Sequence, residues 1–329
     1  MLRISDIKLG TDDTESDLRK KVLKLLGVKN VKSFEISKKS IDARKKPDIH
    51  YVYSVDVETD NEEYYAKKIK NSQIVKKKTY EFPKCGKFDK PVVIVGTGPA
   101  GLMCGLTLAQ NGYKVILLER GKCVEERMKD VEAFWEAGFL NPESNVQFGE
   151  GGAGTFSDGK LTTGIKDFRI RKVLEEFHKH GAPKEILYYS KPHVGTDNLS
   201  KMVASIRSEI RKLGGEVRFS NKLVNVKTDN GEICGAVVES DSGEYVIETN
   251  NIVLAIGHSA RDTFLMLQNR NIAMEQKSFS VGARIEHSQN FRRRIIKWRY
   301  ILKAAEVCIH SVCVRAAELL RLRRRTAVL

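Results

Sequence analysis

The stretch that decides the fold reads Val93-Ile94-Val95-Gly96-Thr97-Gly98-Pro99-Ala100-Gly101-Leu102. The short apolar run that opens it is typical of a parallel strand buried on both faces. The glycines are spaced Gly-x-Gly-x-x-Gly, and apolar residues at helical spacing follow them. A second apolar strand over 114–118 ends at Glu119. Together these segments predict a complete β-α-β unit.

Each glycine of this turn has a mechanical role. Gly96 makes the tight turn, Gly98 lets the backbone approach a pyrophosphate, and Gly101 lets the helix pack closely on the strand. The helix N-terminus directs free N–H groups and the positive end of its dipole at phosphates. Glu119 ends the second strand, where it is placed to accept hydrogen bonds from ribose hydroxyls. The unit predicts a dinucleotide site but does not by itself separate NAD from FAD.

The region that follows narrows the choice of dinucleotide. A glycine-rich stretch over 148–160 precedes a predicted helix over 198–213. Three strands over 223–227, 233–239 and 245–248 form a β-meander, joined by Asp-Asn-Gly and Asp-Ser-Gly turns. A last apolar strand over 251–256 ends at Gly257. This order resembles the FAD domain of the glutathione-reductase-like flavoproteins over about residues 91–289.

Composition excludes several other classes of protein. The 329 residues are 41% apolar and 30% charged, as in a soluble globular protein. The chain has no long apolar run and no signal-peptide core, which predicts a cytoplasmic protein without a transmembrane segment. The six cysteines include no Cys-x-x-Cys pair, so a redox-active dithiol is not indicated. Any electron transfer must then come from a cofactor. Cys308 and Cys313 around His310 match no common zinc spacing, so no metal is predicted.

The net charge of +15 is spread unevenly along the chain. Lys and Arg outnumber Asp and Glu by 22 to 15 over 1–90 and by 11 to 2 over 290–329, while 91–289 has 24 against 25. The region with the nucleotide motif is therefore close to neutral. Residues 1–88 are predicted to form a small basic α/β module, ferredoxin-like or half-ferredoxin. Its strands are expected over 2–9, 32–37 and 50–58, with a helix over 15–26.

The basic clusters of this module, over 38–46 and 76–78, leave a second interpretation open. They could bind phosphate backbones, which would make the chain a nucleic-acid-associated flavoprotein. Few aromatic residues alternate with the lysines, so solvated loop charge is the favoured interpretation.

Six runs are similar, in this order, to the bacterial family of uncharacterised FAD-dependent, or NAD(FAD)-utilising, dehydrogenases. The runs are 93–102, 118–121, 148–163, 191–197, 254–264 and 281–287. The N-terminal module is similar to that of the family as well. The resemblance implies a Rossmann-like FAD-binding domain and a hydride transferred through flavin N5. The resemblance leaves NAD(P)H open as a transient hydride donor. It does not identify the small-molecule substrate.

Matching positions imply how the cofactor would be held. The glycine turn would bind the pyrophosphate and Glu119 the adenosine ribose, with Arg120 and Arg127 near the adenine end or the pyrophosphate. A second glycine turn over 151–155 would pass close to the flavin, where only small residues admit the ring. Val224 or Val226 would offer backbone atoms to adenine. The implied cofactor-binding residues are Gly96, Gly98, Pro99, Ala100, Gly101, Glu119, Arg120, Arg127, Gly152, Ala153, Gly154, Thr155, Val226 and Gly257.

Proton transfer near the flavin has four candidates, which are His258, His193, Lys160 and Asp158. His258 directly follows the glycine that faces the cofactor. His193 lies in a loop-like setting, where a neutral histidine satisfied by backbone partners is the simpler interpretation. The sequence alone assigns none of them a catalytic role.

Residues 290–329 break the pattern of the preceding region. They contain two arginine triplets and neither glycine nor proline. In the similar family the corresponding sequence continues a substrate domain, begun here at about 278, and returns to close over the flavin. We therefore predict a truncated chain whose tail comes from a shifted reading frame and which does not turn over by itself. The alternative is a purposeful basic helix that binds an anionic membrane or nucleic acid.

Overall fold

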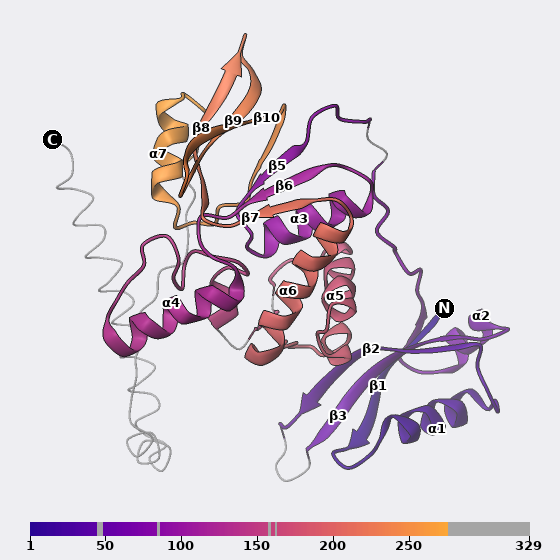
Figure 1. Ribbon diagram of the computed structural model, residues 1–329. Coiled ribbons are helices and arrows are strands. Elements are labelled where there is room, and N and C mark those ends of the chain that lie inside the picture. Colours follow the sequence, from indigo (N-terminus) through magenta and orange to yellow (C-terminus); the bar gives the residue numbers. More distant parts are fainter. Residues whose placement is uncertain (45–48, 84–85, 157–158, 162, 276–329) are drawn as a thin grey trace, which may run out of the picture. The chain divides into compact units, whose positions relative to one another are not determined.

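The computed structural model describes residues 1–275 except 45–48, 84–85, 157–158 and 162. Residues 1–272 form one compact unit (Figure 1). This unit holds an antiparallel sheet, a parallel sheet and a three-stranded meander. The predicted tail over 290–329, the run over 281–287 and the candidate Asp158 lie outside the described residues.

The antiparallel sheet belongs to the N-terminal module. Its elements are β1 (Leu2–Gly10), α1 (Glu15–Leu26), β2 (Ser33–Asp42), β3 (His50–Glu58), α2 (Glu62–Lys68) and β4 (Ser72–Ile74). The strand order β2-β3-β1-β4 with antiparallel pairing is the ferredoxin-like β-α-β-β-α-β arrangement. The ferredoxin-like prediction is therefore confirmed in its complete form. Neither α2 nor β4 was predicted, because α2 buries no residue and β4 has only three.

The parallel sheet contains the predicted β-α-β unit. It consists of β5 (Val92–Val95), α3 (Pro99–Gln110) and β6 (Val115–Leu118), to which β7 (Glu216–Arg218) and β11 (Asn251–Leu254) are added. The strand order is β11-β5-β6-β7, and every pair is parallel. All residues of β5 and β6 are buried, as the apolar runs predicted. The Rossmann-type α/β fold is thus confirmed.

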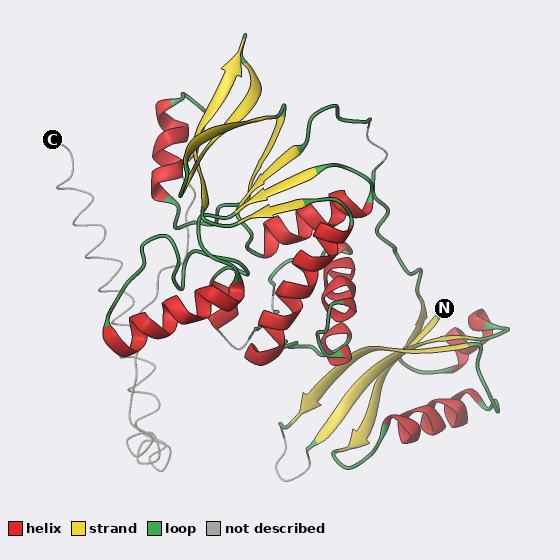
Figure 2. Ribbon diagram, viewed as in Figure 1, coloured by secondary structure: helices red, strands yellow, loops and turns green. Residues whose placement is uncertain are grey.

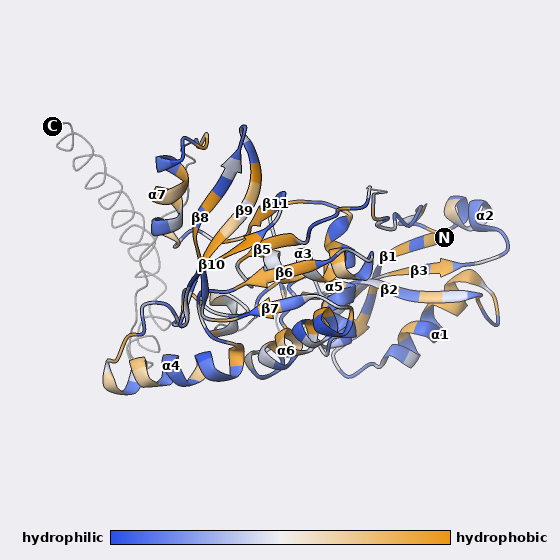
Figure 3. Ribbon diagram, turned by 45° about the horizontal axis from the view of Figure 1, so that its top comes forward, coloured by the Kyte–Doolittle hydropathy of each residue, from blue (hydrophilic) through white to orange (hydrophobic). Residues whose placement is uncertain are grey.

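The two faces of this sheet are covered by different layers (Figure 2). Val92 and Ile94 of β5 face a core formed with α3, α5 (Arg169–Lys179) and α6 (Thr196–Lys212). Val93 and Val95 face the meander on the other side. The alternation follows from the two-residue period of a strand. In Figure 3 the two central strands, β5 and β6, are coloured as hydrophobic over most of their length.

The meander consists of β8 (Asn221–Asp229), β9 (Glu232–Ser240) and β10 (Gly243–Glu248), paired antiparallel in the order β10-β9-β8. These strands confirm the predicted ones with slightly wider bounds. The remaining elements are α4 (Val124–Ala137), α7 (Arg261–Asn269) and two short 3₁₀ turns over Ala153–Phe156 and Lys184–Leu187. Among the described residues, no helix combines the length and apolarity that crossing a bilayer requires.

Candidate functional site

A cavity of ≈ 510 Å³ opens where β5, β6 and β11 end. The glycine turn after β5, Glu119 after β6 and Gly257 after β11 line it. Two further walls come from the loop over 147–153 and from the segment that leads into α7. The carboxyl ends of parallel strands are where open α/β sheets bind their ligands. The position of the cavity therefore agrees with the predicted dinucleotide site.

Two of the three motif glycines are required by the chain's own backbone. Gly96 has φ of 100°, and a Cβ there would lie 2.5 Å from the carbonyl oxygen of Ala255. A Cβ on Gly101 would lie 1.8 Å from the carbonyl oxygen of Gly96. Neither position accepts a side chain, whatever the cavity holds.

Gly98 differs from both of them. Its φ of −67° suits any residue, and a Cβ there would meet no atom within 4 Å. Gly98 is the N-cap of α3 and lines the cavity. The fold does not require a glycine at this position. A ligand that approaches the helix N-terminus closely does explain it, because a side chain would occupy the ligand's space.

The carboxylate of Glu119 joins three segments around the cavity. Its Oε2 accepts hydrogen bonds from the amide and the hydroxyl of Thr97, both at 2.8 Å. Its Oε1 accepts from the amides of Gly121 and Gly149, both at 3.0 Å. Glu119 is only 5% exposed. The side chain therefore holds the glycine turn, the end of β6 and the loop over 147–153 together, in addition to facing the cavity.

We expect Glu119→Gln to lower the free energy of unfolding by about 2–4 kcal/mol, because its NH₂ group would face buried N–H donors and leave them unsatisfied. Chemical denaturation of protein without added cofactor measures this loss. If cofactor-free stability stays unchanged while FAD affinity falls, Glu119 acts on the ribose alone, as the sequence interpretation had it.

Arg127 lies beneath the loop rather than on the cavity wall. The side chain is 0% exposed and donates to the carbonyl oxygens of Asn145, Val146, Glu150 and Gly152 at 2.7–3.0 Å. Burial lowers its pKa to about 10, against the opposing effect of Glu119 and Glu150. A Cβ on Gly149 would lie 2.4 Å from Cδ of Arg127. The guanidinium thus fixes the shape of the loop. Arg127 could contact a cofactor directly only if its side chain left this buried position.

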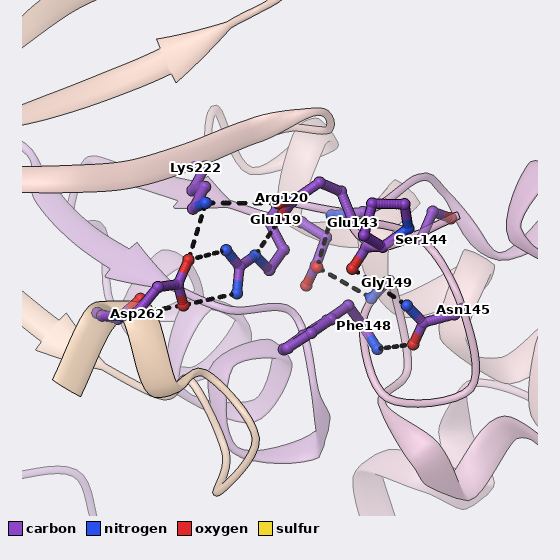
Figure 4. Close-up of polar contacts among 12 residues, drawn as sticks. Glu119, Arg120, Glu143, Ser144, Asn145, Phe148, Gly149, Lys222 and Asp262 are labelled. Atoms are coloured by element: carbon purple, nitrogen blue, oxygen red, sulfur yellow. Dashed lines mark hydrogen bonds and ion pairs between the residues drawn. The ribbon is translucent and has the colours of Figure 1, made fainter. Parts of the chain in front are cut away.

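Four charged side chains form a cluster (Figure 4), and two of them, Arg120 and Lys222, line the cavity. The Nε of Arg120 donates to Glu143 at 2.7 Å, and its two terminal nitrogens pair with Asp262. The ammonium group of Lys222 lies 2.8 Å from Asp262 and 3.4 Å from Glu143. The hydrogen bond from Arg120 is the main cause that holds the pKa of Asp262 well below its usual range. The guanidinium of Arg120 also lies 4.5 Å from the ring centroid of Phe148.

The structure brings most of the sequence-implied cofactor residues together at this cavity. Those on its wall are Gly96, Gly98, Pro99, Ala100, Glu119, Arg120, Gly152, Ala153 and Gly257. Those away from the wall are Gly101, Arg127, Gly154, Thr155 and Val226.

Val226, whose backbone atoms the resemblance implies at adenine, is not on the cavity wall. Val226 is 4% exposed and packs in the apolar core between the meander and the parallel sheet. The start of β8 lines the cavity instead, through Asn221, Lys222 and Leu223.

The candidates for proton transfer separate in space. His258 is exposed and lines the cavity, with its Nε2 at 3.4 Å from the hydroxyl of Ser259. His193 and Lys160 form an isolated antiparallel β-bridge with each other and do not line the cavity. Of the three described candidates, His258 alone stands where it could reach a ligand in this cavity.

The wall formed by the start of α7 was missed from the sequence. Ala260, Thr263, Phe264 and Leu267 line the cavity. Their spacing is helical, which could have indicated one face of a helix that follows Gly257 directly.

The cysteines in the described part of the chain are not paired. Cys104 is in α3, Cys123 precedes α4 and Cys234 is in β9, and each is a free thiol. Burial raises the pKa of the Cys104 and Cys123 thiols. In the same residues, no three His, Cys, Asp or Glu side chains gather as metal ligands would.

The chain is similar to several known proteins. A protein of Clostridium beijerinckii, described as uncharacterized, is 47% identical over 294 residues, covering 88% of this chain and 54% of the relative. Digeranylgeranylglycerophospholipid reductase of Methanocella arvoryzae is 23% identical over 177 residues, covering 52% of this chain and 40% of the reductase. The crystal structure of Thermovibrio ammonificans THI4 aligns with a TM-score of 0.37 and 22% identity, covering 56% of this chain and 64% of that one. The chain thus spans about half the length of the curated relatives it matches.

Two family profiles match the chain. A domain of unknown function matches residues 1–58, within the ferredoxin-like module. The second profile covers residues 90–302, which include the parallel sheet, the meander and the cavity. By that match, over well more than half of its length, the chain belongs to the pyridine nucleotide-disulphide oxidoreductase family.

Proposed function

We propose that the cavity binds FAD and that the chain carries the cofactor-binding part of an FAD-dependent oxidoreductase. One observation carries the proposal: Gly98 lacks a side chain where the fold would accept one, at a helix N-terminus that faces the cavity. When bound, FAD supplies a hydride acceptor and donor at flavin N5. A small-molecule substrate and NAD(P)H as a transient hydride donor belong to the same proposal.

The residues of the cavity have separate tasks in this function. The amides of Ala100 and Gly101 belong to the first turn of α3, whose N–H groups have no acceptor within the helix and suit the pyrophosphate. Gly152 and Ala153 present a wall without bulky side chains, which suits the flavin ring. His258 is the group on the wall that could hold or accept a proton at its imidazole nitrogens.

The test of this function is the cofactor that the purified chain carries. We expect a yellow protein whose heat-released cofactor is FAD, identified by chromatography against FAD and FMN standards. A colourless preparation should take up added FAD in preference to FMN, because FMN lacks the second phosphate and the adenosine, which the helix N-terminus and the Glu119 side of the cavity would bind. Equal or tighter binding of FMN, or no binding of any flavin, would contradict the proposal.

In the described part of the basic N-terminal module, the contacts of two lysines bear on the nucleic-acid alternative. The ammonium group of Lys39 lies 4.1 Å from the ring centroid of Tyr51 and 5.1 Å from that of Tyr189. Lys77 pairs with Glu35 at 2.9 Å. These side chains have partners within the protein. RNA affinity that falls steeply with salt and is localised to residues 1–90 would revive the alternative.

A further inference from the structure

The helix α7 forms one wall of the cavity and has polar ties to the rest of the protein near both of its ends. Near its start, Asp262 pairs with Arg120, which follows β6, and with Lys222 of β8. Just past its end, Nε of Arg270 donates to Asn225 at 2.8 Å. Between these ties, Thr263, Phe264 and Leu267 face the cavity. The tie through Asp262 (Figure 4) is made to two residues that line the cavity, Arg120 and Lys222.

The environment of Arg120 makes this tie more than a surface ion pair. Its side chain is only 11% exposed, and carboxylates of two different segments, Glu143 and Asp262, engage its guanidinium. The two cations Arg120 and Lys222 face the two anions Glu143 and Asp262, so the charges of this cluster balance. Removing the Asp262 carboxylate would leave the largely buried Arg120 guanidinium with one of its two neighbouring negative charges. Such a network fixes geometry more strongly than isolated exposed pairs do.

We infer that Asp262 is a positioning residue that latches α7 over the cavity and sets how fast the bound cofactor leaves. The inference rests on the proposed function, since it concerns the cofactor of the same site. With the latch closed, the first turn of α7 keeps its side chains on the wall. With the latch broken, that turn is held by its apolar contacts alone, and the wall opens more often. Differences in affinity between closely related complexes arise mostly in the dissociation rate, which is where a latch acts.

Salt provides the first test, because Asp262 is 44% exposed and its ion pairs are therefore screened. FAD release is followed by the rise of flavin fluorescence when loaded full-length protein is diluted. At low salt, Asp262→Asn should release FAD about five to ten times faster than the wild type, the effect expected for losing a bidentate, partly buried ion pair. Wild-type release should accelerate with added NaCl, while release from Asp262→Asn should change little. Asp262→Glu keeps the charge and should restore the salt dependence.

Asp167→Asn is the matched control. Asp167 also binds an arginine through both carboxylate oxygens, Arg169 at the start of α5, but neither residue lines the cavity. This variant should release FAD at the wild-type rate. The latch proposal is wrong if Asp262→Asn releases FAD at the wild-type rate, or if Asp167→Asn accelerates FAD release as much as Asp262→Asn does.

A second measurement tests the latch independently of which cofactor the cavity binds. Amide hydrogen exchange over 261–269 should be faster in Asp262→Asn than in the wild type, with and without flavin, while exchange in α3 stays the same. If the wild type binds no flavin, the proposed function fails, and the exchange experiment still tests the latch. If flavin binds but exchange over 261–269 does not respond to Asp262→Asn, the latch fails and the proposed function stands.

Discussion

Replacing Gly98 with leucine is expected to abolish FAD binding while leaving the protein folded. The backbone at Gly98 has φ of −67°, and a Cβ there meets nothing within 4 Å, so the folded chain accepts a side chain. That side chain would project from the N-terminus of α3 into the cavity, where the pyrophosphate must approach the helix. A loss of at least about 1000-fold in affinity follows if the phosphates no longer reach the amides, which corresponds to roughly 4 kcal/mol.

Two companion variants make this result specific. Gly98→Ala should retain a weaker affinity, because a single methyl group takes up less of the space. Gly101→Ala should reduce the amount of folded protein itself, since its Cβ would lie 1.8 Å from a backbone oxygen. Calorimetry with FAD and circular dichroism together separate the two outcomes. Unchanged FAD affinity in a folded Gly98→Leu protein would show that the glycine turn does not bind the pyrophosphate.

Replacing Arg127 with methionine is expected to destabilise the protein by about 3–5 kcal/mol, the usual effect of removing one partner from a buried charged network. Four carbonyl oxygens of the loop over 145–152 would lose their donor. The buried carboxylates of Glu119 and Glu150 would also lose the favourable interaction with its positive charge, although Glu150 keeps its ion pair with Arg207 at 2.6 Å. Methionine fills much of the same volume, so the change reports the lost hydrogen bonds more than a cavity.

Urea denaturation of the cofactor-free protein measures this effect. Arg127→Lys keeps the charge but cannot donate to four carbonyl groups at once, and an intermediate loss is expected. Arg169→Met, on the exposed arginine that pairs with Asp167, should change stability by less than about 1 kcal/mol and serves as the control. A stable Arg127→Met protein with reduced FAD affinity would instead place Arg127 in direct contact with the cofactor.

The parts of the fold that the sequence predicted have strong local signals. The apolar runs of β5 and β6, the glycine spacing and the turns of the meander each specify an element within a few residues. The segments that escaped prediction lack such signals. β7 has three residues. In α4 the buried face consists of Val124, Arg127 and Val131, while Trp135 is 62% exposed, so the apolar residues alone do not show a clear helical periodicity.

The residues of the site also divide into those with a local sequence signal and those without one. Gly96, Gly98 and Glu119 could be assigned because one β-α-β unit brings them together within a short span of chain. The wall formed by α7 depends on the position that the meander gives to this helix. The resemblance implies a place for Arg127 near the adenine end or the pyrophosphate, whereas in the structure four backbone carbonyl groups hold its guanidinium inside the loop. No sequence pattern marks an arginine whose N–H groups are satisfied by backbone carbonyl groups in the interior.

The close packing of Gly96 against Ala255 has a consequence for biosynthesis. The carbonyl group that confines the glycine turn lies 159 residues further along the chain, because β11 returns to pair with β5. A ribosome that adds roughly 5–20 residues per second needs about 8–30 s to supply it. Until then the nascent turn lacks its neighbouring strand. Cofactor loading therefore waits for β11, and flavin supplied before β11 emerges has no finished site to enter.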